Sequence, residues 1–188
     1  MPPHRELEVH AALGLARGVR QVLSPHCDER PAGSVPELIV VHGISLPPGD
    51  FGGPWIERLF CGALPGAAHP YFAALAGTRV SAHALIRRDG ELLQFVPFTL
   101  RAWHAGVSSH QGRAACNDFS IGIELEGTDD LPYEPAQYQT LAALIKALLR
   151  AYPTLDAGRI VGHSDIAPGR KSDPGASFDW ARLGALLA

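Results

Sequence analysis

Residues 38–42 read Leu-Ile-Val-Val-His, a continuous apolar run that ends in an imidazole. Continuous runs rich in β-branched residues are typical of strands that are buried on both faces of a sheet. We therefore expect Leu38–Val41 to form a buried central strand that ends in His42. A second apolar run, Arg159-Ile160-Val161, leads to His163. The two runs predict two strands that each deliver a histidine to an edge of the sheet.

The loop after His163 is rich in proline and glycine and contains Lys171 and Asp173. Two strand-end histidines and one loop carboxylate make a three-ligand set, and catalytic zinc sites use three protein ligands and leave the fourth position to water. A lone histidine at the end of an apolar run is more often a hydrogen-bonded structural residue. The histidines lie about 120 residues apart, so no local motif supports them. Spacing alone leaves both interpretations open.

The other segments predict a mixed sheet covered by helices. Apolar residues recur at helical spacing from Pro135 to Tyr152, which predicts a core-facing helix. Asp89-Gly90 between two alternating segments predicts a β-hairpin. This pattern indicates an α/β or α+β domain. The further elements that we expect are a short amphipathic element or strand within residues 1–36, hairpin strands His83–Arg87 and Glu91–Val96, strands 119–125 and 159–163, and helices Trp55–Cys61 and Phe178–Leu187.

Composition narrows the class of protein. A chain of 188 residues with 46% hydrophobic and 19% charged residues fits one soluble globular domain. The net charge of −3 gives no basic footprint, so we expect neither nucleic acid nor an anionic membrane surface as partner. No apolar run reaches the roughly 20 residues of a membrane span. The first ten residues lack a signal-peptide pattern, and three scattered cysteines favour free thiols in a reducing compartment.

Glu124 lies inside the apolar run Ile121–Leu125, and Glu126 follows on the same face of the expected strand. An unpaired buried charge is costly, so such a carboxylate is paired, solvated in a cleft or functional. Near zinc, Glu124 would be a natural general base for the attacking water. The alternative is an edge-strand glutamate that faces solvent.

Two further groups could line a site. Lys171 would point to the same side of an extended loop as Asp173, where a cation could stabilise an oxyanion. The alternative is a solvated loop lysine. Trp103 and His104 could form a substrate wall and a donor to a metal ligand, although Trp more often packs in a core.

Taken together, these segments resemble the zinc-dependent N-acetylmuramoyl-L-alanine amidase family. Within it, the chain is most similar to the branch of cytoplasmic 1,6-anhydro-N-acetylmuramyl-L-alanine amidases of peptidoglycan recycling. The similarity runs in family order from about residue 15 to 185. The segments that carry it are Val40–Gly49, Arg79–His83, Ala102–Gly106, Cys116–Gly127 and Gly162–Gly175.

The resemblance implies a fold and a site. The fold is one amidase domain over residues 1–188, of α/β class, with a central mixed β-sheet flanked by helices and a zinc groove on one side. The implied cofactor is one Zn²⁺. The family's functional residues fall here on the zinc ligands His42, His163 and Asp173, the catalytic residues Glu124 and Lys171, and the substrate-binding residues Arg79, Trp103, His104 and Ala167.

The implied reaction is hydrolysis of the amide bond between the lactyl group of anhydro-N-acetylmuramic acid and the amine of L-alanine. The implied partner is a small muropeptide, and we expect a cytoplasmic monomer that binds neither nucleic acid nor membrane. Two positions depart from the family pattern. Gly43 stands where asparagine is usual, which removes an amide contact, and Ala115 stands where an arginine reads a peptide carboxylate.

Two rival functions exist on the same fold. One is a peptidoglycan-binding module without catalysis, in which a zinc ligand is lost, whereas all three ligands are present here. The other is a phage-type or exported lytic amidase that cuts polymeric cell wall. The segment Pro47–Pro70 bears on this choice, because its aromatic residues either close over a small substrate as a lid or pack the segment onto the core.

Overall fold

Two seven-residue strands, β5 (Leu38–Ile44) and β11 (Ser120–Glu126), pair in parallel at the centre of the molecule. The structure is a computed structural model that describes residues 6–188, and residues 1–5, where we expect no signal peptide, lie outside it. The register of the pair sets Glu124 directly opposite His42. All seven residues of β11 are buried, as expected for a strand covered on both faces.

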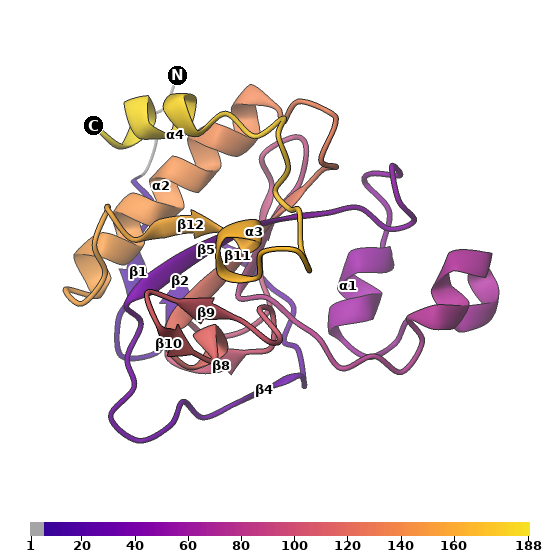
Figure 1. Ribbon diagram of the computed structural model, residues 1–188, viewed down its shortest axis with the longest axis horizontal. Helices are drawn as coiled ribbons and strands as arrows, with labels where there is room; N and C mark the ends of the chain where they lie inside the picture. The colour runs from indigo at the N-terminus through magenta and orange to yellow at the C-terminus, as the bar shows by residue number, and fades with distance from the viewer. Residues whose placement is uncertain (1–5) are drawn as a thin grey trace.

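Six strands of the described chain form one mixed sheet, which confirms the predicted architecture (Figure 1). Neighbouring strands run parallel except β6 and β7, which form the antiparallel hairpin that Asp89-Gly90 predicts. In spatial order the strands are β12 (Ile160–Gly162), β5, β11, β6 (Ala84–Ile86), β7 (Leu92–Gln94) and β3 (Arg20–Gln21).

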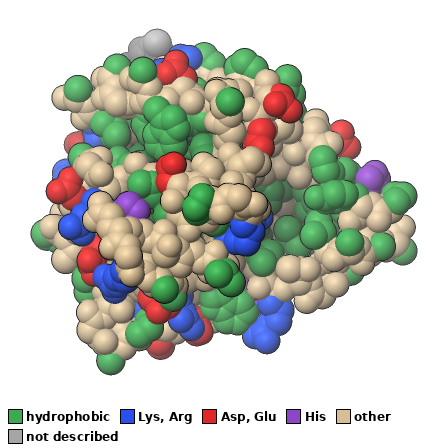
Figure 2. Space-filling model, in the orientation of Figure 1, with side chains coloured by type: hydrophobic (Ala, Val, Ile, Leu, Met, Phe, Trp, Pro, Cys, Tyr) green, Lys and Arg blue, Asp and Glu red, His purple; other side chains and the backbone are tan. Residues whose placement is uncertain are grey.

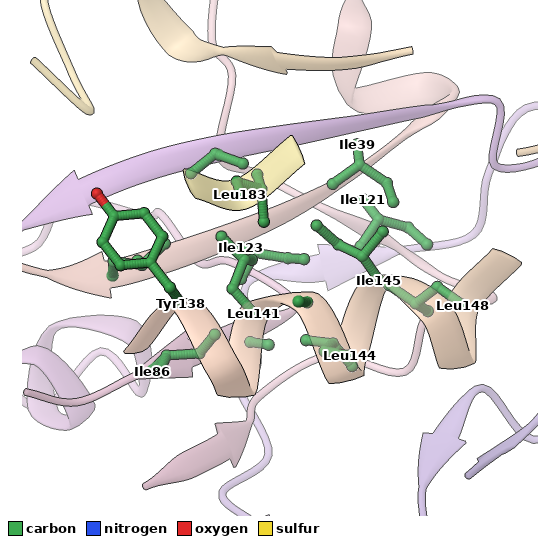
Figure 3. Packing of buried hydrophobic residues seen from close by; sticks show 14 of the residues in the cluster. Ile39, Ile86, Ile121, Ile123, Tyr138, Leu141, Leu144, Ile145, Leu148 and Leu183 are labelled. Atoms are coloured by element: carbon green, nitrogen blue, oxygen red, sulfur yellow. The ribbon is translucent and has the colours of Figure 1, made fainter. Parts of the chain in front are cut away.

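Helices α2 (Pro135–Ala151) and α4 (Trp180–Leu187) cover one face of this sheet. Side chains alternate across a strand, so Ile39 of β5 and Ile121 and Ile123 of β11 point into this layer. There they meet Leu141 and Ile145 of α2 (Figure 3). The even-numbered residues of the two strands face the opposite side, and these include His42 and Glu124.

A lobe beside the sheet contains α1 (Trp55–Phe60) and the 3₁₀ helices η1 (Gly66–Ala68) and η2 (Pro70–Ala74). The predicted helix at 55–61 is confirmed, and its residues Ile56, Leu59 and Phe60 are buried. Residues 6–188 also contain the 3₁₀ helix η3 (Cys116–Asp118) and three small antiparallel ribbons: β1 (Val9–His10) with β2 (Leu15–Ala16), β4 (Cys27–Asp28) with β8 (Arg101–Ala102), and β9 (Ser109–His110) with β10 (Arg113–Ala114).

The last predicted strand is shorter than 159–163. It ends at Gly162, and His163 is instead the first residue of the short helix α3 (His163–Ile166). The carboxylate of Asp165 accepts a hydrogen bond from the Gly162 N–H at 2.7 Å, which fixes this turn. The terminal helix begins at Trp180 rather than Phe178, because the Asp179 side chain caps it by accepting from the Arg182 N–H.

Within residues 6–188, none of the helices combines the length and the apolar character that a membrane crossing requires.

The packing of α2 on the sheet makes a direct stability prediction. Ile145 is fully buried between α2 and the strands, so Ile145→Ala removes apolar contacts and leaves a cavity. We expect it to lower the free energy of unfolding by about 2–5 kcal/mol, measured by urea denaturation. Lys146→Ala on the exposed side of the same helix should change it by no more than about 0.5 kcal/mol. Equal effects of the two substitutions would contradict this account of the core.

Candidate metal centre and active site

Three side chains from different parts of the fold meet at the carboxyl end of β5. His42 belongs to β5, His163 starts α3, and Asp173 lies in the loop that follows. Their facing atoms are close: His42 Nδ1 and His163 Nδ1 lie 3.0 Å apart, and Asp173 Oδ2 lies 3.3 and 3.1 Å from them. The structure therefore brings together the three residues that the sequence predicted as ligands.

The loop that carries Asp173 is held by backbone and side-chain contacts. The carbonyl of Asp173 accepts from the Ser164 N–H at 3.0 Å, and the Lys171 N–H donates to the Ala167 carbonyl at 3.0 Å. The buried hydroxyl of Tyr133 donates to the Pro174 carbonyl at 2.9 Å. Three independent contacts thus fix the carboxylate against the two imidazoles.

The donor set fits a zinc ion. Zinc binds nitrogen and oxygen ligands at about 2.0–2.1 Å in tetrahedral geometry, which places neighbouring ligand atoms about 3.3 Å apart. The observed separations of 3.0–3.3 Å lie close to that value. Burial lowers the pKa of His42 to about 4, so this imidazole is neutral at pH 7, as a metal ligand must be.

Glu124 projects from β11 beside this cluster. Its side chain is buried, and Oε2 finds no hydrogen-bond partner among residues 6–188. Burial, together with the nearby charge of Asp173, raises the pKa of Glu124 well above its ordinary value. A buried carboxylate oxygen without a partner, next to a metal-binding set, is the arrangement that a general base requires.

The cluster opens into a cavity of about 630 Å³ that Glu124 and Lys171 also line. Figure 2 shows the surface hollowed between the main body and the α1 lobe. The lobe contributes Leu59, Phe60 and Tyr71 to the wall. A larger hollow of about 850 Å³ lies between α2 and the β6–β7 hairpin, but it contains none of the predicted site residues, so size does not locate the site.

The four predicted substrate-binding residues occupy different places. Trp103 and His104 line the cavity, and the guanidinium of Arg79 lies 4.8 Å from the Trp103 ring centroid. The Trp103 indole is fixed from behind, because its N–H donates to Asp28 at 3.0 Å. Ala167 does not line the cavity, and its carbonyl instead anchors the Lys171 loop. Direct contacts of these residues with a substrate stay predictions.

The two glutamates of β11 have different surroundings. Glu126 pairs with Arg87 at 3.3 Å and accepts from the Gly52 N–H at 2.6 Å. It therefore connects the sheet to the segment Pro47–Pro70, whereas Glu124 keeps a free oxygen. Within that segment Phe60 packs onto the core, where its ring meets Phe95 edge to face, whereas Phe51 and Trp55 are only partly buried.

The positions that depart from the family pattern also differ in setting. Gly43 lines the cavity, and a Cβ there would collide with the hydroxyl of Tyr133. A side chain at position 43 and the Tyr133 hydroxyl therefore cannot occupy this space together. Ala115 is exposed and left-handed, with φ of 59°, in a turn outside the cavity lining.

Sequence reasoning missed two groups that hold the site together. Tyr133 precedes α2 and carries no motif, yet its hydroxyl reaches the loop of Asp173. The Arg170 guanidinium donates to the carbonyls of Ala105 and Val107 at 2.6 and 2.7 Å and connects the two loops at the cavity mouth. Arg170 was visible in the sequence, but its partners Ala105 and Val107 lie more than 60 residues away.

Comparisons with known proteins agree on one family. The family model described as N-acetylmuramoyl-L-alanine amidase matches residues 32–176. The 1,6-anhydro-N-acetylmuramyl-L-alanine amidase AmpD of Citrobacter freundii is 65% identical over 168 residues, 89% of each chain. A crystal structure of a Se-Met AmpD derivative has a TM-score of 0.91 at 62% identity and covers 94% of this chain and 98% of that chain.

A more distant solved structure includes a ligand. AmpDH3 from Pseudomonas aeruginosa, in complex with anhydromuramic pentapeptide, is 33% identical with a TM-score of 0.58. The match covers 80% of this chain and 59% of that chain.

The isolation of Glu124 predicts a pH-dependent gain in stability on its removal. Folding raises the pKa of the Glu124 carboxyl above its unfolded-state value, which is near 4.3. Such a group costs the protein no stability at pH values below the unfolded-state pKa. The folded protein then loses stability as the pH rises through the folded-state pKa. Glu124→Gln should therefore stabilise the metal-free protein at neutral pH by about 1–3 kcal/mol, the usual cost of a buried unpaired group.

The gain should disappear below pH 4, where the wild-type carboxyl is protonated in both states. Urea denaturation with chelator present, at several pH values, measures this. Glu126→Gln is the matched control, and it should destabilise the protein because it breaks the pair with Arg87. A Glu124→Gln variant that is less stable at neutral pH would refute the assignment.

Proposed function

Because this chain belongs to the N-acetylmuramoyl-L-alanine amidase family, we propose that it hydrolyses the amide bond between 1,6-anhydro-N-acetylmuramic acid and L-alanine in peptidoglycan recycling. The chain is an amide hydrolase, and the names of its high-identity relatives give this substrate. The observation that carries the proposal is the unpartnered carboxylate of Glu124 beside the set His42, His163 and Asp173, in one cavity.

We propose zinc as the metal of this set. Two imidazoles and one carboxylate suit zinc, and the separations of their facing atoms fit ligands of one such ion. When bound, zinc supplies acidification of a water and polarisation of the amide carbonyl.

The chain's own residues carry the proton and the charge. Glu124 accepts the proton of the attacking water through its free Oε2 and passes it to the amine of the leaving L-alanine. The raised pKa of Glu124 suits both roles, because the group must accept a proton and then give it up. Lys171 lines the same cavity, and its ammonium stabilises the negative charge that develops on the carbonyl oxygen.

The cavity walls support a small sugar-peptide as substrate. The Trp103 ring offers a flat apolar surface, with Arg79 stacked on it and Tyr71 on the lobe. We propose that Arg79, Trp103 and His104 form this side of the binding site. Ala167 contributes indirectly, because its carbonyl accepts from the Lys171 N–H and holds the loop of Lys171 in place.

We further propose that residues 1–188 form one amidase domain that acts as a cytoplasmic monomer on muropeptides, without nucleic-acid or membrane partners. Contacts of the N-terminal segment with α2 support a single unit: Arg150 donates to the Leu7 carbonyl and Tyr152 to the Ala11 carbonyl. The free state of Cys27, Cys61 and Cys116 supports a reducing compartment.

The ligand set predicts the metal content. Purified protein should contain about one zinc per chain. His163→Ala removes one of three protein ligands and should abolish stable zinc binding, measured by elemental analysis after dialysis. His10→Ala, at an exposed histidine far from the cavity, is the control and should keep its zinc. Full zinc retention by His163→Ala would refute this ligand set.

The catalytic roles predict two kinetic patterns. Glu124→Gln should keep zinc and lose about 10²–10⁴-fold in kcat, the range for removal of a general base. Lys171→Met should lower kcat more than it raises KM, because an oxyanion contact forms only as charge develops. An unchanged kcat with a raised KM in Lys171→Met would assign the lysine to substrate binding instead.

Mass spectrometry of the products tests the function itself. Incubation with anhydro-muramyl tripeptide should release the free tripeptide and the anhydro sugar, and intact sacculi should be turned over much more slowly. Glu124→Gln is the control for a contaminating amidase. Comparable turnover of sacculi and soluble fragments would favour a lytic amidase, and no cleavage of either would refute the proposal.

A further inference from the structure

A chain of hydrogen bonds runs away from the metal-binding set behind His42. The His42 Nε2 lies 2.9 Å from the Nδ1 of His104. The other nitrogen of His104, Nε2, lies 3.1 Å from the Ser120 hydroxyl, and that hydroxyl donates to the Cys116 carbonyl at 2.6 Å. His42 thus uses one nitrogen toward the metal set and the other toward this chain.

The end of the chain decides the direction of every bond in it. A serine hydroxyl has one proton, and Ser120 gives it to the Cys116 carbonyl, which can only accept. Ser120 must therefore accept the proton of His104 Nε2. In neutral His104 the Nδ1 is then unprotonated, so it accepts from His42 Nε2–H. This assigns the proton of neutral His42 to Nε2 and leaves the Nδ1 lone pair facing His163 and Asp173.

The opposite direction would disable the site. If His104 donated to His42, the remaining proton of neutral His42 would lie on Nδ1, the atom that faces the two other ligands. A protonated nitrogen has no lone pair for a metal. The direction in which Ser120 donates its proton therefore decides whether His42 Nδ1 has a lone pair available for a metal.

The His104 ring is held in place by its neighbours in the fold. It lies against Gly122 of β11, where any Cβ would collide with the imidazole. Its backbone N–H and that of Ala105 both donate to the Asn117 side chain, at 3.1 and 2.8 Å. The ring meets His42 edge to face, with an interplanar angle of 88°. The fold therefore holds His104 in one orientation toward His42.

We propose that His104 is a positioning residue that, together with Ser120 and the Cys116 carbonyl, holds His42 in the Nε2-protonated tautomer and so presents its Nδ1 to the metal. This inference rests on the proposed metal site, and it gives His104 a role behind the ligand in addition to any contact with substrate. Partners of this kind usually contribute 10–100-fold to metal affinity.

Two substitutions of His104 separate positioning from simple packing. In His104→Asn, the side-chain oxygen can stand where Nδ1 stood and accept from His42, so we expect most of the zinc affinity to be kept. His104→Leu fills similar space without an acceptor and should lower zinc affinity by about 10–100-fold. Competition with a zinc chelator measures both affinities without any substrate. Equal losses in the two variants, or no loss in His104→Leu, would overturn the proposal.

A spectroscopic measurement tests the tautomer directly. Nitrogen-15 NMR of histidine-labelled, metal-free protein should show His42 protonated at Nε2 and unprotonated at Nδ1. Ser120→Ala removes only one hydroxyl and serves even if His104→Leu does not fold. It should shift the His42 tautomer signals and weaken zinc binding, whereas unchanged signals and affinity would overturn the proposal.

The readouts separate this inference from the proposed function. The wild-type protein could fail to cleave anhydro-muramyl peptide while the His42 tautomer and the zinc affinities of the variants behave as expected. That result would refute the proposed activity and support the positioning role of His104. Normal cleavage by a wild-type protein whose His42 is protonated at Nδ1 in the metal-free state would refute the positioning role of His104 and leave the proposed activity intact.

Discussion

The parallel register between β5 and β11 is the constraint on which the site depends, because it sets Glu124 opposite His42. Side chains alternate along a strand, so the same register sends Ile39 and Ile123 into the layer under α2. A slip of either strand by one residue would turn its polar group, His42 or Glu124, toward that core and expose its apolar residues. The hydrophobic core therefore fixes the alignment of His42 and Glu124 without contacting them.

The two faces of the sheet have opposite tasks. The α2 face is filled with apolar side chains and supplies stability (Figure 3). The other face gathers groups that destabilise a fold when no metal is present: lone pairs that face each other and a buried carboxylate without a partner. Binding of the proposed metal would relieve the first of these and would therefore stabilise the fold.

Hydrogen bonds and an ion pair hold the loops around the cluster of His42, His163, Asp173 and Glu124. Arg170 joins the loop after α3 to the loop after β8, Glu126 joins the sheet to the segment before α1, and Tyr133 fixes the loop of Asp173. Each contact uses a carbonyl, a backbone N–H or a buried ion pair as partner. These contacts hold the cavity wall in place, and a preorganised site is the condition under which the role proposed for Lys171 is strongest.

The sequence by itself determined the main elements and, through family resemblance, predicted which three residues the fold would bring together as candidate metal ligands. The buried strand at 38–41, the hairpin at Asp89-Gly90 and the helix from Pro135 follow from local periodicity and turn chemistry, and the structure has all three. Boundaries were less predictable: His163 starts a helix because Asp165 caps the turn before it, a contact that periodicity does not reveal.

Only the tertiary structure decided which partners each polar side chain has. Glu124 and Glu126 share one face and one strand, and only the position of Arg87 and Gly52 distinguishes the paired carboxylate from the free one. His104 and Tyr133 act through partners more than 40 residues away. Local sequence encodes backbone periodicity, whereas the protonation and orientation of a side chain depend on neighbours that only the folded chain brings into contact.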